Sequence, residues 1–524
     1  MGIYLNPDNI QFLEAFNKEI YVDKSLLIQQ VEYLKKNVNK YICVSRPRRF
    51  GKSTDANMLV AYYSKGCDSS DLFNHLKISH TKQYETHLNN HNVFHLNMQD
   101  FLSQTHDIKQ MIQLINDSLV WDLLLQYKDL MYFDQTKLIR DLNDIYCQTH
   151  EQFIFIIDEW DCIFREYKND KDAQKTYLDF LRNLLKDKPY VELAYMTGIL
   201  PIKKYGTHSA LNMFEEISMI DAEPLPEFMG FTETEVENLC LQHHVSYDEM
   251  KEWYDGYQVR DDLSTFSPRS VVSAIVRKKF GNYWTSTETY EALQVYIDMN
   301  FDGLKDDVIK LLAGENVPVQ TSSFQNDMTT LKSKDDVLTL LIHLGYLGYN
   351  DSHQTCYIPN KEVVDSFVNS IRNSDWKETT KALLNSQKLL EATWNQDEEM
   401  VAKYIEEAHL DTSILIYNNE NALAYTLSIA YIYARNHYTI IREMPTGKGF
   451  ADMVFIPYHD KPAMIVELKW KQDVQTAITQ IKEKKYPKEL EKYKDNLLII
   501  GITYDQQTKK HTCCIEKMHD KNCI

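Results

Sequence analysis

Long apolar runs and paired cysteines are both lacking from this sequence of 524 residues. No run reaches the roughly 18–20 apolar residues that cross a bilayer. The first residues include early acids and no apolar signal core, so no secretory leader is predicted. The nine cysteines are scattered and form no CxxC pair. This usage is typical of a reducing compartment and argues against a zinc site. We therefore expect a cytoplasmic protein with no membrane partner.

Repeats, low-complexity segments and Gly/Ser linkers are lacking too, so domain boundaries must come from changes in pattern. A chain of this length is too long for one compact core, because single domains are usually about 100–200 residues long. We predict three parts: residues 1–225, 226–400 and 401–524.

The formal net charge of −19 opposes nucleic-acid binding if it is taken as uniform. It is not uniform. After residue 400 the chain has 17 Lys and Arg against 16 Asp and Glu. The acidity therefore belongs to the first 400 residues. The basic stretch 482–494 is either a solvated helix face with paired Glu and Lys or a contact for a phosphate-bearing partner.

Short apolar runs alternate with longer helical patterns between residues 38 and 200. The runs 40–44, 93–98, 153–158 and 191–197 are typical of buried strands, and the spacers are long enough for crossover helices. This rhythm predicts an α/β fold, a parallel sheet with helices on both faces, of the P-loop nucleotide-binding kind.

The middle region, 226–400, is expected to be mostly helical. Thr232 is the predicted N-cap of one helix. The stretches 333–350 and 357–371 suggest helix, hairpin and helix, as in a winged-helix unit. Beyond residue 415 the pattern predicts a helix (419–435), three strands (438–443, 450–457, 463–469), a helix (473–486) and an apolar run (496–504), a second α/β domain.

A phosphate-binding loop is predicted between the strand at 40–44 and the helix that follows. Gly51, Lys52 and Ser53 form the second half of the pattern GxxxxGK[ST]. Such a loop cradles phosphates with backbone N–H groups, while the lysine reaches the terminal phosphates and the hydroxyl binds Mg²⁺. Arg46 occupies the place of the first glycine. The predicted nucleotide-binding residues of this loop are Arg46, Arg49, Gly51, Lys52, Ser53 and Thr54. The arginines at 46, 48 and 49 either stabilise phosphate charge or face an acidic surface.

Two acids, Asp158 and Glu159, lie at the end of the predicted strand 153–158. Asp158 suits the water shell of Mg²⁺, and Glu159 suits the orientation of an attacking water. A helix N-cap is the simpler interpretation of Asp158, but the nearby phosphate loop makes it the weaker one. Thr197, at the end of the following strand, is a candidate sensor of the γ-phosphate.

A second chemical site is predicted in the segment "FADMVFIPYHDKPAMIVELKW", residues 450–470. Glu467 and Lys469 are two apart and share a strand face, whereas Met464, Val466 and Leu468 take the other. A hairpin at 458–462 brings Asp452 toward Glu467. Two carboxylates so close need a cation, and Mg²⁺ can activate water against a phosphodiester. Lys469 would then orient or deprotonate that water.

The helix at 419–435 supplies a third carboxylate, Glu420, and Gln480 on the later helix faces the same cleft in this interpretation. Glu420, Asp452 and Glu467 are the predicted metal ligands, together with Ser53 and Asp158 at the nucleotide site. For the spacing alone, a surface ion cluster on an antiparallel sheet is the more common explanation.

The motifs, taken in order, resemble a known combination of domains. "SRPRRFGKS" (45–53), "IIDEWD" (156–161), "TGI" (197–199), "FSPRSVV" (266–272) and "YW" (283–284) resemble the AAA-ATPase-like domain of bacterial proteins. "YNNENAL" (417–423), "REMPTGKGFADMVFIP" (442–457) and "VELKW" (466–470) resemble the PD-(D/E)XK nuclease domain often fused to it. The resemblance implies ATP binding through Lys52, Ser53, Asp158 and Glu159, and a metal-dependent nuclease core of Glu420, Asp452, Glu467 and Lys469.

Two functions of different classes follow. The first is an ATP-regulated, Mg²⁺-dependent nuclease acting on nucleic acid, DNA being favoured. The second is a nucleotide-switched binding protein whose nuclease fold grips its partner without cutting. An ATPase with an inert C-terminal scaffold is a third interpretation. ATP and Mg²⁺ are the expected cofactors, and a homo-oligomer is one expected assembly, because a neighbour's arginine can complete such an ATPase site.

Overall fold

The structure is a computed structural model of the chain. It describes residues 2–518, apart from 203–210, 285–292, 294, 297–298, 300, 302, 313, 325–330, 373–376, 412–426, 428–429, 447–448, 458–460, 471–472, 484–489, 491–492, 494–495 and 506–509.

The chain forms two compact units. Unit 1 comprises Met1–Thr289 and Val317–Val363, and unit 2 comprises Tyr290–Asn316 and Val364–Ile524. Each unit is described by itself. The sequence-based boundaries near residues 225 and 400 stay a prediction.

A five-stranded parallel sheet forms the centre of unit 1. Its strands are β1 (Tyr41–Ser45), β2 (Asn92–Asn97), β3 (Phe153–Asp158), β4 (Val191–Gly198) and β5 (Glu215–Ile217), in the order β2-β3-β4-β1-β5. Every residue of β1 and β3 is buried, as expected for strands covered on both faces. The four strands predicted from apolar runs are therefore confirmed. The short edge strand β5 was not predicted.

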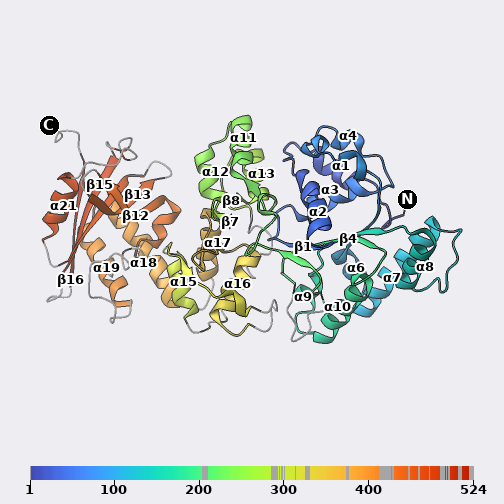
Figure 1. Ribbon diagram of the computed structural model, residues 1–524. Coiled ribbons are helices and arrows are strands. Elements are labelled where there is room, and N and C mark those ends of the chain that lie inside the picture. Colours follow the sequence, from blue (N-terminus) through green and yellow to red (C-terminus); the bar gives the residue numbers. More distant parts are fainter. Residues whose placement is uncertain are drawn as a thin grey trace. The chain divides into compact units, whose positions relative to one another are not determined.

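Helices cover both faces of this sheet (Figure 1). One face carries α1 (Ile10–Phe16), α2 (Leu26–Asn37), α3 (Lys52–Tyr63) and α4 (Ser70–Phe73). The other carries α6 (Met98–Ser103), α7 (Ile108–Gln126), α8 (Leu138–Thr149), α9 (Cys162–Glu166) and α10 (Lys171–Leu185). Two short turns, η1 (Lys77–His80) and α5 (Tyr84–His87), precede β2. The helical crossovers between parallel strands are the reason for this layered arrangement.

The rest of unit 1 consists of helices with two small antiparallel sheets. Thr232 caps α11 and, with Glu235, makes a full capping box, which confirms the predicted helix start. The hairpin of β10 and β11 lies between α16 and α17, in the predicted order of helix, hairpin and helix, and the preceding strand β9 pairs with β11. The elements are η2 (Pro226–Phe228), β6 (Phe231–Thr232), α11 (Glu233–His243), α12 (Tyr247–Tyr254), β7 (Tyr257–Arg260), β8 (Leu263–Phe266), α13 (Pro268–Arg277), β9 (Val317–Pro318), η3 (Thr321–Ser323), α16 (Lys334–Leu344), β10 (Gly348–Asn350), β11 (Thr355–Tyr357) and α17 (Lys361–Arg372), which continues into unit 2.

Unit 2 contains a mixed five-stranded sheet in the order β12-β13-β14-β15-β16. The predicted strands and the later helix of this region are confirmed, whereas β16 was not predicted. The elements are α15 (Leu304–Leu312), α18 (Lys377–Trp394), α19 (Glu398–Asp411), η5 (Ile432–Asn436), β12 (Tyr438–Thr446), β13 (Gly449–Pro457), β14 (Ala463–Trp470), α21 (Val474–Glu483), β15 (Leu497–Asp505) and β16 (Lys510–Lys517). Among the described strands of this sheet, β14 and β15 pair in parallel and the other neighbours pair antiparallel.

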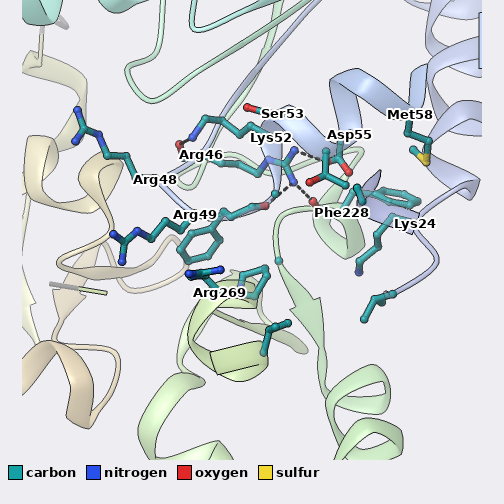
Figure 2. A pocket seen from close by; sticks show the side chains of 18 of the residues that line it. Lys24, Arg46, Arg48, Arg49, Lys52, Ser53, Asp55, Met58, Phe228 and Arg269 are labelled. Carbon is teal, nitrogen blue, oxygen red and sulfur yellow. Dashed lines mark hydrogen bonds and ion pairs between the residues drawn. The ribbon is translucent and has the colours of Figure 1, made fainter. Parts of the chain in front are cut away.

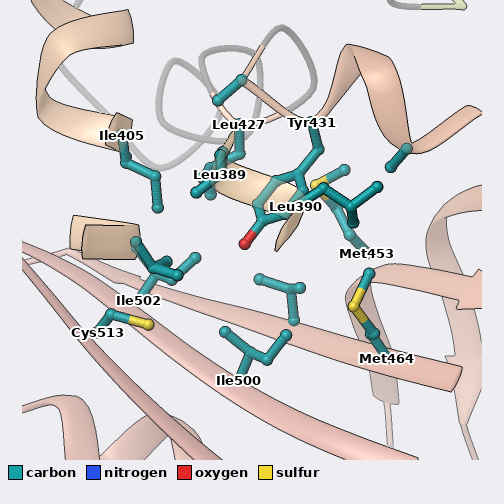
Figure 3. Close-up of a cluster of buried hydrophobic side chains, with 14 of the residues drawn as sticks. Leu389, Leu390, Ile405, Leu427, Tyr431, Met453, Met464, Ile500, Ile502 and Cys513 are labelled. Carbon is teal, nitrogen blue, oxygen red and sulfur yellow. The ribbon is translucent and has the colours of Figure 1, made fainter. Parts of the chain in front are cut away.

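Two apolar clusters lie on opposite faces of this second sheet. Figure 3 shows the first, where Leu389, Ile405 and Tyr431 pack over Ile500 and Ile502 of β15. The second contains side chains of α21 and the other face of the strands. A sheet covered on both faces excludes water, so a charged side chain within it needs a partner.

Candidate functional site

The phosphate loop spans residues 46–51, between β1 and α3. Gly51 has φ of 85°, a left-handed conformation that side chains rarely adopt, although no atom lies close enough to obstruct a Cβ there. Lys52 then begins α3, so the N–H groups of its first turn, including those of Ser53 and Thr54, are available at the loop. Ser53 is exposed and Thr54 half-buried. The predicted strand, loop and helix are therefore all present.

A cavity of about 920 Å³ lies over this loop. One part of its lining is basic, and another is apolar. The basic side chains are Lys18, Lys24, Arg46, Arg48, Arg49, Lys52, Arg165 and Arg269, and the apolar ones include Ile20, Val22, Phe231 and Val272. A volume of this size and lining suits a small ligand with both anionic and apolar parts.

Lys52 is folded back over the loop. Its Nζ donates to the carbonyl oxygens of Arg46 at 3.0 Å and Pro47 at 2.9 Å. Burial lowers the pKa of Lys52 to about 8, although Glu159 and other acids nearby favour the charged form. The ammonium thus lies buried at the cavity wall, where an anionic ligand would stabilise its charge.

Arg46 occupies the position of a glycine in the general pattern and has a structural partner. Its guanidinium forms an ion pair with Asp55 of α3 and donates to the carbonyl of Phe228. Figure 2 shows it directed at these two groups, with Arg48 and Arg49 on the other side of the loop. Arg46 is only 2% exposed. In this arrangement its guanidinium holds the loop against α3, which the sequence pattern did not indicate.

Arg49 and Arg269 lie together at the cavity. Arg49 donates to the backbone carbonyls of Tyr283 at 2.6 Å and Trp284 at 3.0 Å. Burial lowers the pKa of Arg49, and the nearby charge of Arg269 adds to this effect. Arg269, from α13, was not predicted to belong to the site. It is separated from the loop by more than 200 residues, so no local motif could have placed it there.

Asp158 and Thr197 meet beside the phosphate loop because of strand order. β4 lies between β1 and β3, so its end, Thr197, falls next to the end of β3. The Thr197 hydroxyl donates to Asp158 Oδ1, and the Glu159 N–H donates to the same oxygen at 3.0 Å. Asp158 is 2% exposed. Asp158 and Thr197 thus contact each other, and Lys52 interacts electrostatically with Asp158; their roles at a nucleotide stay a prediction.

Glu159 is paired with an arginine that the sequence analysis missed. Arg165 of α9 donates to Glu159 Oε2 and also lies 3.6 Å from Asp161 Oδ2. Burial raises the pKa of Glu159, while Arg165 and Lys52 oppose that rise. Glu159 has φ of 54°, so its backbone is in the left-handed region. Such backbone conformations are concentrated at functional sites.

Asp161 and Gly198 show why the motifs "IIDEWD" (156–161) and "TGI" (197–199) contain an acid and a glycine at these positions. Asp161 is fully buried, and its Oδ2 accepts from the N–H groups of Ile199 at 3.1 Å and Leu200 at 2.9 Å. A Cβ on Gly198 would lie 2.5 Å from Trp160 Nε1. The hydrogen bonds of Asp161 and the contact of Gly198 with Trp160 therefore hold the ends of β3 and β4 together, and with them Asp158 and Thr197.

Asp452 and Glu467 share one face of the sheet in unit 2. Met453 pairs with Val466, and continuing this register places Asp452 opposite Glu467. Met453, Val466 and Leu468 belong to the cluster on the α18 and α19 side. Since side chains alternate, Asp452, Glu467 and Lys469 take the face on which α21 packs. Asp452 Oδ2 accepts from the Leu468 N–H at 2.7 Å.

Lys469 pairs with Glu467 along the strand. Nζ of Lys469 lies 3.2 Å from Oε1 of Glu467, with the two side chains 14% and 2% exposed. Gly501 of β15 pairs with Glu467, and a Cβ there would lie 3.0 Å from the carbonyl of Val474. The missing side chain therefore lets the first turn of α21 approach the sheet beside Glu467.

The remaining predicted members of this site are placed as follows. Gln480 is half-buried on α21. Glu420 lies outside the described residues. Within the described part of the chain, no group of three or more His, Cys, Asp or Glu side chains is arranged to hold a metal ion. Asp452 and Glu467 are two carboxylates on one face with an ammonium beside them, and carboxylate oxygens are the donors that Mg²⁺ prefers. The residues present fit a hard divalent cation.

Two family models match the chain, one within each of the two units. Residues 11–207 match the family model described as "Predicted AAA-ATPase". Residues 419–513 match the model of the PD-(D/E)XK nuclease superfamily. The chain therefore carries an AAA-ATPase-like domain and, after it, a domain of the PD-(D/E)XK nuclease superfamily. No curated protein matches the chain significantly.

Several solved structures show a distant likeness. The Walker-type ATPase PABY2304 of Pyrococcus abyssi is 13% identical, with 66% of this chain and 96% of that chain covered and a TM-score of 0.35. PCH-2 of C. elegans is 10% identical, with 64% and 72% covered and a TM-score of 0.22. The ORC2 protein of Aeropyrum pernix is 11% identical, with 68% and 97% covered and a TM-score of 0.28. Values this low support no conclusion about function.

None of the helices in the described part of the chain combines the length and apolar composition that crossing a bilayer requires.

Proposed function

We propose that unit 1 binds and hydrolyses ATP. The strongest support is a 920 Å³ cavity with a basic and an apolar part, lined by Lys52, Ser53 and Glu159, together with the Asp158–Thr197 pair at the neighbouring strand ends. The basic part suits the phosphates, and the apolar part suits a purine. Lys52 would exchange its bonds to the loop carbonyls for bonds to the terminal phosphates. Ser53 and Asp158 would hold Mg²⁺, which neutralises phosphate charge.

Hydrolysis needs a group that orients and deprotonates water. Glu159 is the candidate for this role, because it follows Asp158 directly, lines the cavity and interacts electrostatically with Lys52. Arg165 favours the ionised carboxylate of Glu159, which opposes the effect of burial on its pKa. Thr197, bonded to Asp158, would report the presence of the γ-phosphate to that carboxylate.

We propose that unit 2 cleaves phosphodiester bonds in nucleic acid, with DNA as the favoured substrate. The observation that carries this proposal is the common face shared by Asp452, Glu467 and Lys469. Asp452 and Glu467, with Glu420, would hold Mg²⁺. That ion supplies Lewis-acid activation of water and of the scissile phosphate. Lys469 would orient the water and offset negative charge that develops on the phosphate.

ATP binding at unit 1 would regulate the nuclease of unit 2 in this proposal. One observation favours a second candidate, a nucleotide-switched binding protein that does not cut. The formal charge of −19 fits a protein partner better than it fits DNA.

A cleavage panel separates the two candidates. Full-length protein is incubated with plasmid, linear and single-stranded DNA and with RNA, with or without Mg²⁺ and ATP. The nuclease proposal expects Mg²⁺-dependent products that disappear in Glu467→Gln. Binding of a nucleic acid without any cleavage, under every condition, would favour the second candidate.

A further inference from the structure

The dipeptide Tyr283–Trp284 is held from two sides by charged groups. Both of its carbonyl oxygens accept from Arg49 of the phosphate loop, at 2.6 and 3.0 Å. Both of its N–H groups donate to Oε1 of Glu362, at 2.6 and 2.7 Å. Ser270 donates to the other oxygen of Glu362 at 2.7 Å. We call Arg49, Tyr283, Trp284 and Glu362 the clamp.

Two members of the clamp are buried against the phosphate loop, whereas Arg49 and Tyr283 are half-buried. Glu362 and Trp284 are each 1% exposed. Gly345 faces Pro47 of the loop, and a Cβ on Gly345 would lie 2.7 Å from the Pro47 ring and 3.2 Å from Trp284. The indole of Trp284 also donates to the carbonyl of Arg48 at 3.4 Å. A shift of the loop therefore cannot leave Trp284 in place.

Arg49 itself has a strained backbone. Its φ of 70° is in the left-handed region, which is unfavourable for a non-glycine residue. A strained segment held by a few polar bonds is suited to change conformation when those bonds are exchanged.

The position of the clamp along the chain is informative. The chain leaves unit 1 after Thr289 and again after Val363. Trp284 comes a few residues before the first of these exits, and Glu362 is adjacent to the last residue before the second. Two of the three points at which the chain crosses between the units are therefore close in sequence to residues of the clamp, and the third lies between Asn316 and Val317.

We propose that the clamp transmits nucleotide occupancy of the phosphate loop to the two chain connections that leave unit 1 after Thr289 and after Val363. This inference rests on the proposed binding of nucleotide at Lys52. The phosphates of a nucleotide compete with the two neutral carbonyls for Arg49, because an anionic acceptor attracts the guanidinium more strongly than a neutral one and can bind it through two parallel hydrogen bonds. Release of the carbonyls loosens the dipeptide, and with it both exits.

Hydrogen–deuterium exchange of the full chain tests the inference with a non-hydrolysable ATP analogue and Mg²⁺. Binding of the analogue is measured separately with a fluorescent nucleotide. We expect faster exchange in peptides that contain residues 281–284 and 361–364 when the analogue is bound. Bound nucleotide with unchanged or slower exchange overturns the clamp proposal alone. A folded protein that binds no nucleotide overturns the proposed function, and the clamp proposal falls with it.

Glu362→Gln provides the matched test of transmission, with Asp336→Asn as control. Asp336 is another buried carboxylate of unit 1, bonded to the N–H of Lys332 and the hydroxyl of Ser323. Measurements at about pH 8 keep Glu362 ionised in the wild type, since burial raises its pKa to about 7.

We expect Glu362→Gln to bind the analogue within about threefold of wild type, yet to reduce the nucleotide-induced exchange change in residues 364–372 by about fivefold or more, the lower end of common coupling strengths. Asp336→Asn keeps the wild-type response. Equal responses in Glu362→Gln and wild type contradict the proposal, as does an equal loss in both variants, which points to a general effect of losing a buried charge. Circular dichroism verifies that both variants are folded.

Discussion

Nζ of Lys469 lies 3.2 Å from Oε1 of Glu467, and both side chains leave the same face of β14. Asp452, opposite Glu467 on the neighbouring strand, shares that face. Two acids and an amine on one face of an otherwise apolar sheet need a reason, because burying charge is costly. The cation and phosphodiester substrate of the proposed function would supply one.

Replacing Lys469 by alanine should remove cleavage with little effect on the fold. The side chain is in polar contact with Glu467 and makes no contribution to either apolar cluster. We expect the rate of Mg²⁺-dependent cleavage to fall by about 10²–10³-fold, as for other groups that stabilise transition-state charge. Initial rates on a labelled substrate measure this loss.

Lys482→Ala is the matched control for that experiment. Lys482 is an exposed lysine of α21 paired with Glu516. It should retain activity. Cleavage by Lys469→Ala at the wild-type rate would remove Lys469 from the mechanism.

Asp452→Asn should weaken metal binding without unfolding unit 2. An asparagine oxygen can still accept the bond from the Leu468 N–H, so the hairpin is retained. The lost charge reduces affinity for a divalent cation. In thermal unfolding, Mg²⁺ and Mn²⁺ should raise the melting temperature of the wild type, because ligands stabilise the state they bind.

In Asp452→Asn the rise in melting temperature caused by Mg²⁺ or Mn²⁺ should largely disappear. Addition of a chelator should bring the wild type to the melting temperature of the metal-free variant. An identical metal-induced increment in the two proteins would show that Asp452 is not a ligand.

Nucleotide binding should be accompanied by proton uptake near pH 8–9. The free protein holds the pKa of Lys52 at about 8, chiefly through burial. Phosphates raise that pKa by favouring the charged ammonium. Above pH 8 the free protein is therefore partly deprotonated at Lys52 and takes up a proton on binding, so affinity falls as the pH rises.

Isothermal titration calorimetry in two buffers of different ionisation enthalpy measures this uptake. Lys52→Met should bind more weakly and should lose the uptake. Wild-type binding with no proton exchange between about pH 8 and 9 would contradict the position assigned to Lys52.

Glu159→Gln should bind ATP and fail to hydrolyse it. The substitution keeps the size of the side chain and removes its capacity to accept a proton, and general bases typically contribute about 10²–10⁴-fold. Phosphate release measures hydrolysis, and a fluorescent nucleotide measures binding. Glu166→Gln, an exposed acid lining the same cavity, is the control and should keep both activities. Hydrolysis that survives in Glu159→Gln would assign the base elsewhere.

The sequence predicted those features that depend on local pattern. The four main strands of the parallel sheet are short apolar runs, and the common face of Glu467 and Lys469 follows from the period of two in a strand. It did not predict β16, whose residues 510–517 alternate polar and apolar on an edge. It also could not predict that Arg46 pairs with Asp55, because the pattern leaves a side chain's partner open.

The clamp was beyond sequence reasoning for the same reason. Arg49 and Trp284 are more than 200 residues apart, and their bond uses backbone carbonyls, which carry no signal in the side-chain pattern. The motifs that contain them were visible, but only the fold shows that the motifs converge on one loop.

The most direct test of the account is a crystal structure of the full chain grown with Mn²⁺, with the ion located by anomalous scattering. We predict a peak within about 2–2.5 Å of carboxylate oxygens of both Asp452 and Glu467, the range of metal–oxygen bonds for hard divalent cations. Well-ordered Asp452 and Glu467 side chains with no peak between them, at Mn²⁺ concentrations that support the thermal shift, would contradict it.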